Sequence, residues 1–156
     1  AGPEEARIRA AIEKTGLSGH VRLLGGVSED TLWDAYRACD LFVMPNVAVP
    51  GDMEGFGLVA IEAGLAARFI VASDLEGIRD AVTPMHNGDL IPAGDSDAFA
   101  RTIVSRLADR PGLDILGSAA QRFVLENFGW TRTIEEYLRI FDSVREIQAG
   151  ESTLHD

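Results

Sequence analysis

Apolar positions along the chain change their period repeatedly, and these changes divide the sequence into alternating elements. Helical spacing predicts helices over 3–17, 57–67, 113–128 and 131–148 and a shorter helical piece at 76–82. A helix over 28–39 is expected to be capped by Ser28, and another is expected to be capped by Asp95 or Ser96 and ended by Pro111 and Gly112. Continuous apolar runs lie between them at 21–24, 41–44 and 69–72, and a further extended segment lies at 90–91. Runs without polar alternation are typical of strands that are covered on both faces.

Alternating strands and helices predict an α/β fold: a Rossmann-like parallel sheet with flanking helices and a helical C-terminal extension. We expect one domain over residues 1–148 and a disordered tail over residues 149–156. Ligands of such sheets bind outside the carboxyl ends of the strands, in the loops that lead into the helices. The chemistry of the protein is therefore expected in those loops.

Composition narrows the classes of partner. The 156 residues include 14 Lys and Arg against 25 Asp and Glu, a net charge of −11. Nucleic acid and anionic membranes require a basic surface, so neither is an expected partner. The single cysteine, Cys39, excludes an internal disulfide, and no apolar stretch is long enough to span a membrane. These features predict a cytoplasmic protein, and the histidines show no metal-ligand spacing.

The most informative segment, residues 54–62, connects a predicted strand to a predicted helix. It reads Glu-Gly-Phe-Gly-Leu-Val-Ala-Ile-Glu, so that Glu54 and Glu62 flank a glycine-rich turn. Gly55 and Gly57 allow a ligand to approach the backbone closely. The first N–H groups of the helix, from Gly57 onward, form an anion site together with the helix dipole. A phosphate on these amides, with hydroxyl groups held by the two carboxylates, fits a nucleotide sugar.

The spacing of two glutamates does not by itself establish a site. A second pair with the same spacing, Glu5 and Glu13, lies on a predicted solvated helix face. The glycines and the strand–loop–helix context distinguish the 54–62 pair from it. On the residues alone, a ligand site and a glycine-rich structural turn both stay open. The second reading describes a flavodoxin-like regulatory or scaffold module that binds nothing.

Segment 54–62 resembles the E-x7-E motif of the GT-B, family 4 type glycosyltransferases, retaining enzymes that use sugar nucleotides. The similarity extends over residues 17–145, with matching segments at 21–27, 40–45, 70–74, 76–78, 87–92 and 94–95 and at Trp130. It implies the C-terminal half of a GT-B fold, without its first strand and without the N-terminal acceptor domain. It further implies retaining transfer of a hexosyl group from a UDP-, GDP- or ADP-sugar to an acceptor glycan, lipid or small molecule, with no activity for this fragment alone.

The resemblance also implies roles for individual residues. Glu54 would be the catalytic residue and contact hydroxyls of the transferred sugar. Backbone N–H groups that would bind the sugar and the distal phosphate belong to Gly55, Phe56, Gly57 and Leu58. Glu62 would accept hydrogen bonds from the ribose hydroxyls. Gly25 and Val27 would lie near the nucleobase, and no metal or cofactor is implied.

Two departures from the family pattern bear on the site. The Arg and Lys with which the family binds the diphosphate have no counterpart, since the only lysine is Lys14, on the first predicted helix. Glu76 stands where the family has the first residue of a Gly-Gly turn, which adds negative charge near the site. A GT-B phosphorylase or epimerase with the same site stays an alternative. A peripheral position of a longer protein on the inner face of the membrane also stays open.

Overall fold

The computed structural model of the chain describes residues 2, 4–49, 51 and 56–152, with side chains described as far as residue 145. The chain forms two compact units, residues 1–35 and 36–156, where the sequence predicts one domain over 1–148. The division falls within helix α2 (Glu29–Ala38). Ser28 caps this helix as predicted, because the N–H of Thr31 donates to its Oγ at 3.3 Å.

The first unit holds α1 (Glu5–Lys14) and an extended segment that leads to α2. The predicted strand at 21–24 is wrong, since these residues form neither helix nor strand. Val21 and Leu24 are 41% and 54% exposed. An apolar run becomes a strand only when a neighbouring strand completes its backbone hydrogen bonds. Residues 21–24 have no such neighbour within the described part of the chain.

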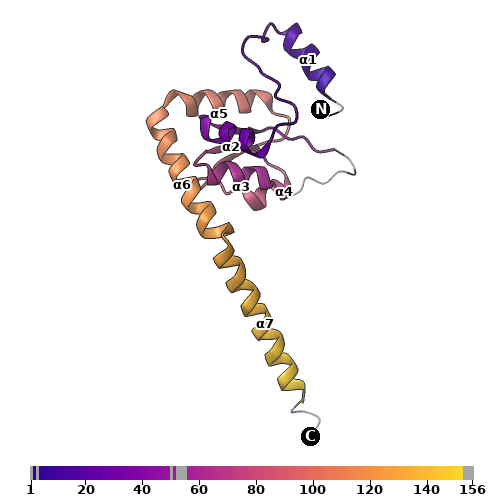
Figure 1. Ribbon diagram of the computed structural model, residues 1–156, viewed down its shortest axis with the longest axis vertical. Coiled ribbons are helices and arrows are strands. Elements are labelled where there is room, and N and C mark those ends of the chain that lie inside the picture. Colours follow the sequence, from indigo (N-terminus) through magenta and orange to yellow (C-terminus); the bar gives the residue numbers. More distant parts are fainter. Residues whose placement is uncertain (1, 3, 50, 52–55, 153–156) are drawn as a thin grey trace. The chain divides into compact units, whose positions relative to one another are not determined.

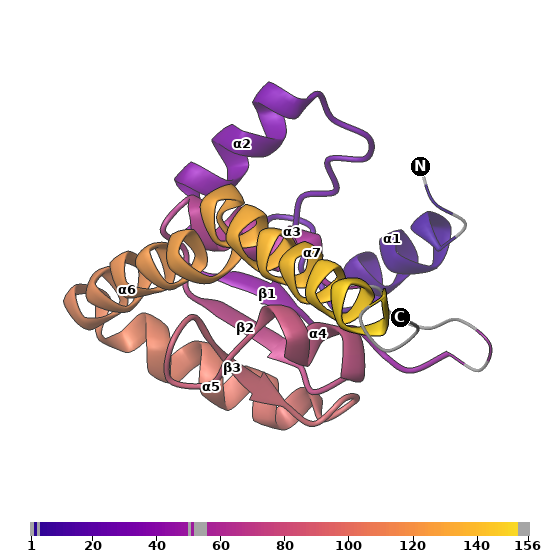
Figure 2. The same cartoon turned by 90° about the horizontal axis from the view of Figure 1, so that it is seen from below.

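The second unit is built on a parallel sheet of three strands in the order β1–β2–β3 (Figure 2). The strands are β1 (Phe42–Met44), β2 (Ile70–Ser73) and β3 (Gly88–Ile91). The register places Val43 beside Val71 and Ile70 beside Gly88. Every residue of the central strand β2 is buried. The predicted parallel α/β sheet is therefore confirmed, and its central strand is covered on both faces.

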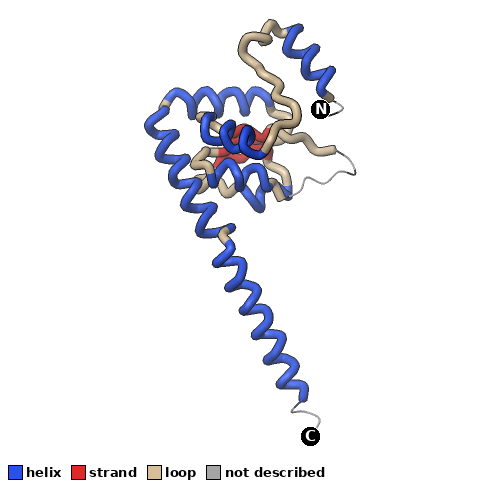
Figure 3. Tube along the Cα trace, viewed as in Figure 1, coloured by secondary structure: helices blue, strands red, loops and turns tan. Residues whose placement is uncertain are grey.

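Helices cover both faces of this sheet (Figures 1 and 3). On one face lie α3 (Leu58–Leu65) and α4 (Glu76–Ala81), and on the other lies α5 (Ser96–Ala108). Successive side chains of β2 point to opposite layers. Val71 packs with Ile91 and with Phe99 of α5, whereas Ile70 approaches α3. This alternation places the hydrophobic core on both sides of β2.

Helix α6 (Arg110–Phe128) packs along α3. Pro111 and Gly112 do not separate two helices as the sequence predicts, because both lie in the first turn of α6. Proline fits there, since the first turn leaves its N–H positions without intrahelical partners. The side chain of Gln121 donates to the carbonyl oxygen of Leu65 at 2.6 Å. This bond ties the last turn of α3 to α6.

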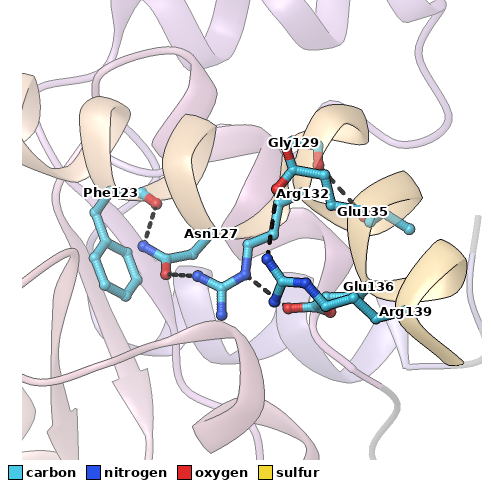
Figure 4. Close-up of polar contacts among 8 residues, drawn as sticks. Phe123, Asn127, Gly129, Arg132, Glu135, Glu136 and Arg139 are labelled. Atoms are coloured by element: carbon cyan, nitrogen blue, oxygen red, sulfur yellow. Dashed lines mark hydrogen bonds and ion pairs between the residues drawn. The ribbon is translucent and has the colours of Figure 1, made fainter. Parts of the chain in front are cut away.

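Polar side chains connect the end of α6 to the beginning of α7 (Trp130–Ser152) (Figure 4). Arg132 donates to Asn127 Oδ1 at 2.8 Å and to Glu136 Oε1 at 2.9 Å, and Asn127 donates to the carbonyl oxygen of Phe123 at 2.8 Å. Helix α7 continues to Ser152, so the expected disordered tail begins as helix, and residues 153–156 lie outside the described residues.

Candidate functional site

The candidate site lies where the segment after β1 enters α3. Residues 52–55 are outside the described part of the chain, and the predictions for Glu54 and Gly55 fall there. The described residues of the motif are Phe56, Gly57, Leu58 and Glu62. The structure brings these four together at the beginning of α3 and in its first turns.

Gly57 is the N-cap of α3 and is buried, with φ 73° and ψ 40° in the left-handed region. A Cβ at this position would lie 3.5 Å from the Cβ of Ala81, on α4. Its carbonyl oxygen accepts from the N–H of Ala60 at 2.8 Å, and no side chain of a described residue caps the helix. The first N–H groups of an α-helix have no intrahelical partner. Those of Leu58 and Val59 have no hydrogen-bond acceptor among the described residues, and the side chain of Leu58 beside them is exposed.

Replacing Gly57 by alanine is expected to lower the free energy of unfolding by about 1–2 kcal/mol, because an L-residue is strained at this positive φ. The new methyl group meets Ala81 at an ordinary contact distance, so strain and not overlap is the cause. Urea unfolding followed by circular dichroism measures the change. Gly19→Ala is the control, since an added Cβ there meets nothing within 4 Å and its φ is not positive. Equal stability of the two variants would contradict the prediction.

Phe56, directly before the N-cap of α3, belongs to an aromatic cluster. The ring of Phe56 packs edge-to-face on Phe128 of α6, with centroids 5.8 Å apart. Phe128 in turn contacts Phe123, on which His86 stacks at 5.0 Å. The side chain of Phe56 therefore packs on α6, while 42% of the residue stays exposed.

Glu62 lies on the second turn of α3 and is half-buried. The hydroxyl of Tyr36, near the end of α2, donates to its Oε2 at 2.9 Å. The Tyr36 side chain is 5% exposed, and its ring packs edge-on against Phe42 of β1 at 5.6 Å. Burial first, and then the hydrogen bond to Glu62 and its charge, raise the pKa of Tyr36 to about 12. Oε1 of Glu62 accepts no hydrogen bond from a described residue.

Tyr36 is the residue of this arrangement that the sequence did not single out. It belongs to the apolar stripe of the helix predicted over 28–39. A tyrosine on an apolar stripe does indicate a buried hydrogen bond, because a buried phenol hydroxyl needs a partner. The partner itself is 26 positions away in the sequence and cannot be found from helical spacing.

Cys39, on the same stripe, is half-buried, and its thiol donates to the carbonyl oxygen of Tyr36 at 3.4 Å. Burial raises the pKa of this thiol. A cysteine nucleophile needs the thiolate, which a raised pKa disfavours. The environment of Cys39 therefore fits a small packed side chain, in agreement with its place in the predicted apolar stripe.

The two residues predicted near the nucleobase, Gly25 and Val27, belong to the first unit. Gly25 has φ 67°, and an added Cβ would meet nothing within 4 Å. Val27 is 39% exposed. Within their unit, both residues therefore present an open surface.

The carboxyl end of β2 carries further polar groups. Ser73 is fully buried, and its hydroxyl has no hydrogen-bond partner among the described residues. Asp74, the next residue, accepts a hydrogen bond from Arg79 of α4, which lowers the pKa of this carboxyl group. The edge of the sheet at which ligands of parallel α/β domains bind is thus polar here.

The sheet is parallel and covered on both faces, and a glycine turn leads into a helix that carries a carboxylate one turn later. These features define a Rossmann-like α/β domain. The family profile described as "Glycosyl transferases group 1" matches residues 1–123. The chain belongs to this family.

Curated relatives agree with this assignment. The chain is 31% identical over 144 residues to a phosphatidyl-myo-inositol mannosyltransferase of Mycobacterium leprae, covering 90% of this chain and 36% of that protein. It is 36% identical over 126 residues to a D-inositol 3-phosphate glycosyltransferase of Salinispora tropica, covering 81% of this chain and 25% of that protein. The chain therefore spans between a quarter and just over a third of the length of these relatives.

Solved structures of other proteins share the fold of this chain. Sucrose-phosphate synthase from Thermosynechococcus elongatus is 29% identical with a TM-score of 0.76, covering 94% of this chain and 35% of that one. Anabaena HepE in complex with UDP is 25% identical with a TM-score of 0.77, covering 88% and 36%. The C-terminal domain of the group 1 protein LpcC from Francisella tularensis, at 19% identity, shares the fold with a TM-score of 0.71, covering 83% and 67%.

The predicted fold, the C-terminal half of a GT-B enzyme, is thus confirmed. Within the described residues, none of the helices combines the length and the apolar composition that crossing a membrane requires.

Proposed function

We propose that this chain is the donor-binding half of a glycosyltransferase and that it binds a nucleoside diphosphate sugar at the beginning of α3. The observation that carries the proposal is the position of Glu62, a half-buried carboxylate one turn inside a helix whose N-cap is Gly57. Helix N–H groups suit a phosphate, and a carboxylate suits a pair of ribose hydroxyls. Anabaena HepE, which is similar to this chain, has been solved with UDP and with UDP-glucose.

Each group then has one task. The N–H groups of Gly57 and Leu58 bind the distal phosphate, and the helix dipole stabilises the charge that develops on the leaving diphosphate. Glu62 holds the ribose, and Glu54 and Gly55 contact the sugar. Gly25 and Val27 lie at the base, which is uracil, guanine or adenine. The hexosyl group is transferred with retention of configuration, by positioning the donor and not through a cysteine nucleophile.

The transfer as a whole is proposed for proteins of the relatives' full length, of which this chain spans 36% or less. The 156 residues are expected to bind the donor nucleotide without turnover. Affinity is expected to be weak, in the millimolar range, because the lysine and arginine of the family's phosphate site have no counterpart and the net charge is −11. Binding is therefore the step to test on this chain.

The test is a protein-observed NMR titration with UDP, GDP and ADP in turn. We expect saturable shifts for one nucleotide in residues 25–27 and 56–62. Glu62→Ala is expected to weaken that affinity about 10- to 100-fold, the contribution of hydrogen bonds to a charged group. Glu13→Ala is the matched control, since Glu13 is an exposed glutamate of the other pair with this spacing. Unchanged binding by folded Glu62→Ala would overturn the ribose role, and no binding by the parent would favour a scaffold module.

A further inference from the structure

Glu62 and Tyr36 form a part-buried hydrogen-bonded pair that joins α3 to the end of α2. Tyr36 donates to one carboxylate oxygen, Oε2, and leaves Oε1 without a hydrogen bond from the described residues. The ring of Tyr36 is fixed by burial and by its edge-on contact with Phe42 of β1. A hydroxyl held in this way restricts the orientations that the Glu62 carboxylate can adopt.

A glutamate with three rotatable side-chain bonds otherwise samples several rotamers on a helix surface. An ionised carboxylate accepts at two oxygens with two lone pairs each. One donor from the protein on Oε2 therefore leaves acceptor positions on both oxygens. Those positions match two neighbouring hydroxyl groups, such as the 2′- and 3′-hydroxyls of a ribose.

We infer that Tyr36 is a positioning residue, which orients the Glu62 carboxylate so that it binds the two ribose hydroxyls of the donor nucleotide. This inference rests on the proposed function of Glu62. Tyr36 contacts the carboxylate through its hydroxyl and acts on the ligand through Glu62. Its effect is therefore confined to ligands that carry the ribose hydroxyls.

The test is the affinity ratio between UDP and 2′,3′-dideoxy-UDP, or the corresponding GDP or ADP pair where that base binds, measured by NMR titration. The parent is expected to prefer the nucleotide with hydroxyls. Tyr36→Phe keeps the ring and its contact with Phe42 and removes the donor. We expect it to lower the ratio about 3- to 10-fold, the effect of losing one hydrogen bond that aligns an acceptor. Tyr137→Phe, at an exposed tyrosine of α7, is the control and is expected to leave the ratio unchanged.

The ratio separates positioning from a merely structural role, because a general distortion of the site weakens both nucleotides equally. An equal weakening in Tyr36→Phe would therefore overturn the inference. Glu62→Ala is expected to reduce the ratio to about 1, and adding Tyr36→Phe to it is expected to change nothing further. If Glu62→Ala abolishes the preference while Tyr36→Phe retains it, this inference fails and the proposed function stands. If Glu62→Ala retains the preference, the proposed ribose site itself fails.

Discussion

Replacing Gly117 by alanine is expected to lower the free energy of unfolding by about 3 kcal/mol, the upper range for overpacking a close contact. Gly117 lies on the face of α6 that packs against the end of α3. A Cβ built there would lie 2.2 Å from the carbonyl oxygen of Ala67 and 3.1 Å from its carbonyl carbon. A backbone group cannot rotate away as a long side chain does, so α6 and the turn after α3 that holds Ala67 would have to separate.

The sign of this change makes the experiment decisive. In a helix interior, alanine is normally more stable than glycine by about 0.5–1 kcal/mol. Ser118→Ala is the control, because Ser118 is the next residue of α6 and is exposed. We expect it to be neutral or slightly stabilising in urea unfolding. A gain of stability in Gly117→Ala would show that α3 and α6 are farther apart than the structure places them.

Glycine at this contact illustrates what the sequence does not reveal. Gly64 is the counterpart on α3, where an added Cβ would lie 2.6 Å from Cγ2 of Val124. The apolar period correctly predicts both helices, but nothing in the sequence indicates that either glycine lies at a close contact with another segment. Residues 64 and 124 are remote in sequence, and their contact depends on how two helices pack on the same face of the sheet. Periodicity describes one element at a time and carries no such information.

The same limit explains which strands were predicted. Residues 69–72 and 41–44 are apolar runs that do form strands, displaced by at most one residue. Residues 21–24 have an equally apolar pattern and form none, because a strand needs a neighbour as well as suitable side chains. Local capping could be predicted from the sequence more closely. Of the two expected caps, Asp95 and Ser96, it is Asp95 that caps α5, by accepting from the N–H of Ala98.

Some features of the candidate site could also be predicted from the sequence, and others could not. The turn at Gly57 and the position of Glu62 on the following helix could be predicted, since both depend on neighbouring residues. The hydrogen bond from Tyr36 could not be predicted, because it joins residues of two different helices that are 26 positions apart in the sequence. Pro111 shows the converse error, in which a residue that breaks helices in general was placed at the wrong boundary. Its place in the first turn of α6 depends on Asp109, the N-cap of a helix that begins at Arg110, three residues before the predicted start at 113.

Raising the pH from about 10 to about 12 is expected to lower the free energy of unfolding by about 2–3 kcal/mol through Tyr36 alone. In the unfolded chain the phenol has its ordinary pKa of 10.0, whereas burial and the neighbouring Glu62 raise it to about 12 in the folded chain. The folded state therefore binds this proton more tightly. The resulting stabilisation is fully present below pH 10 and is lost as the pH rises through the folded pKa.

Urea unfolding at a series of alkaline pH values measures this loss, and Tyr36→Phe is expected to lack the part due to Tyr36. Burial also raises the pKa of the Cys39 thiol, which adds a loss in the same direction. The parent and Tyr36→Phe both keep Cys39. The difference between their dependences of unfolding free energy on pH therefore isolates the contribution of Tyr36. Glu62→Ala is expected to reduce the Tyr36 contribution without abolishing it, because burial is the largest cause of the shift. Parallel slopes for the parent and Tyr36→Phe would show that the phenol is not held in a buried, carboxylate-bonded position.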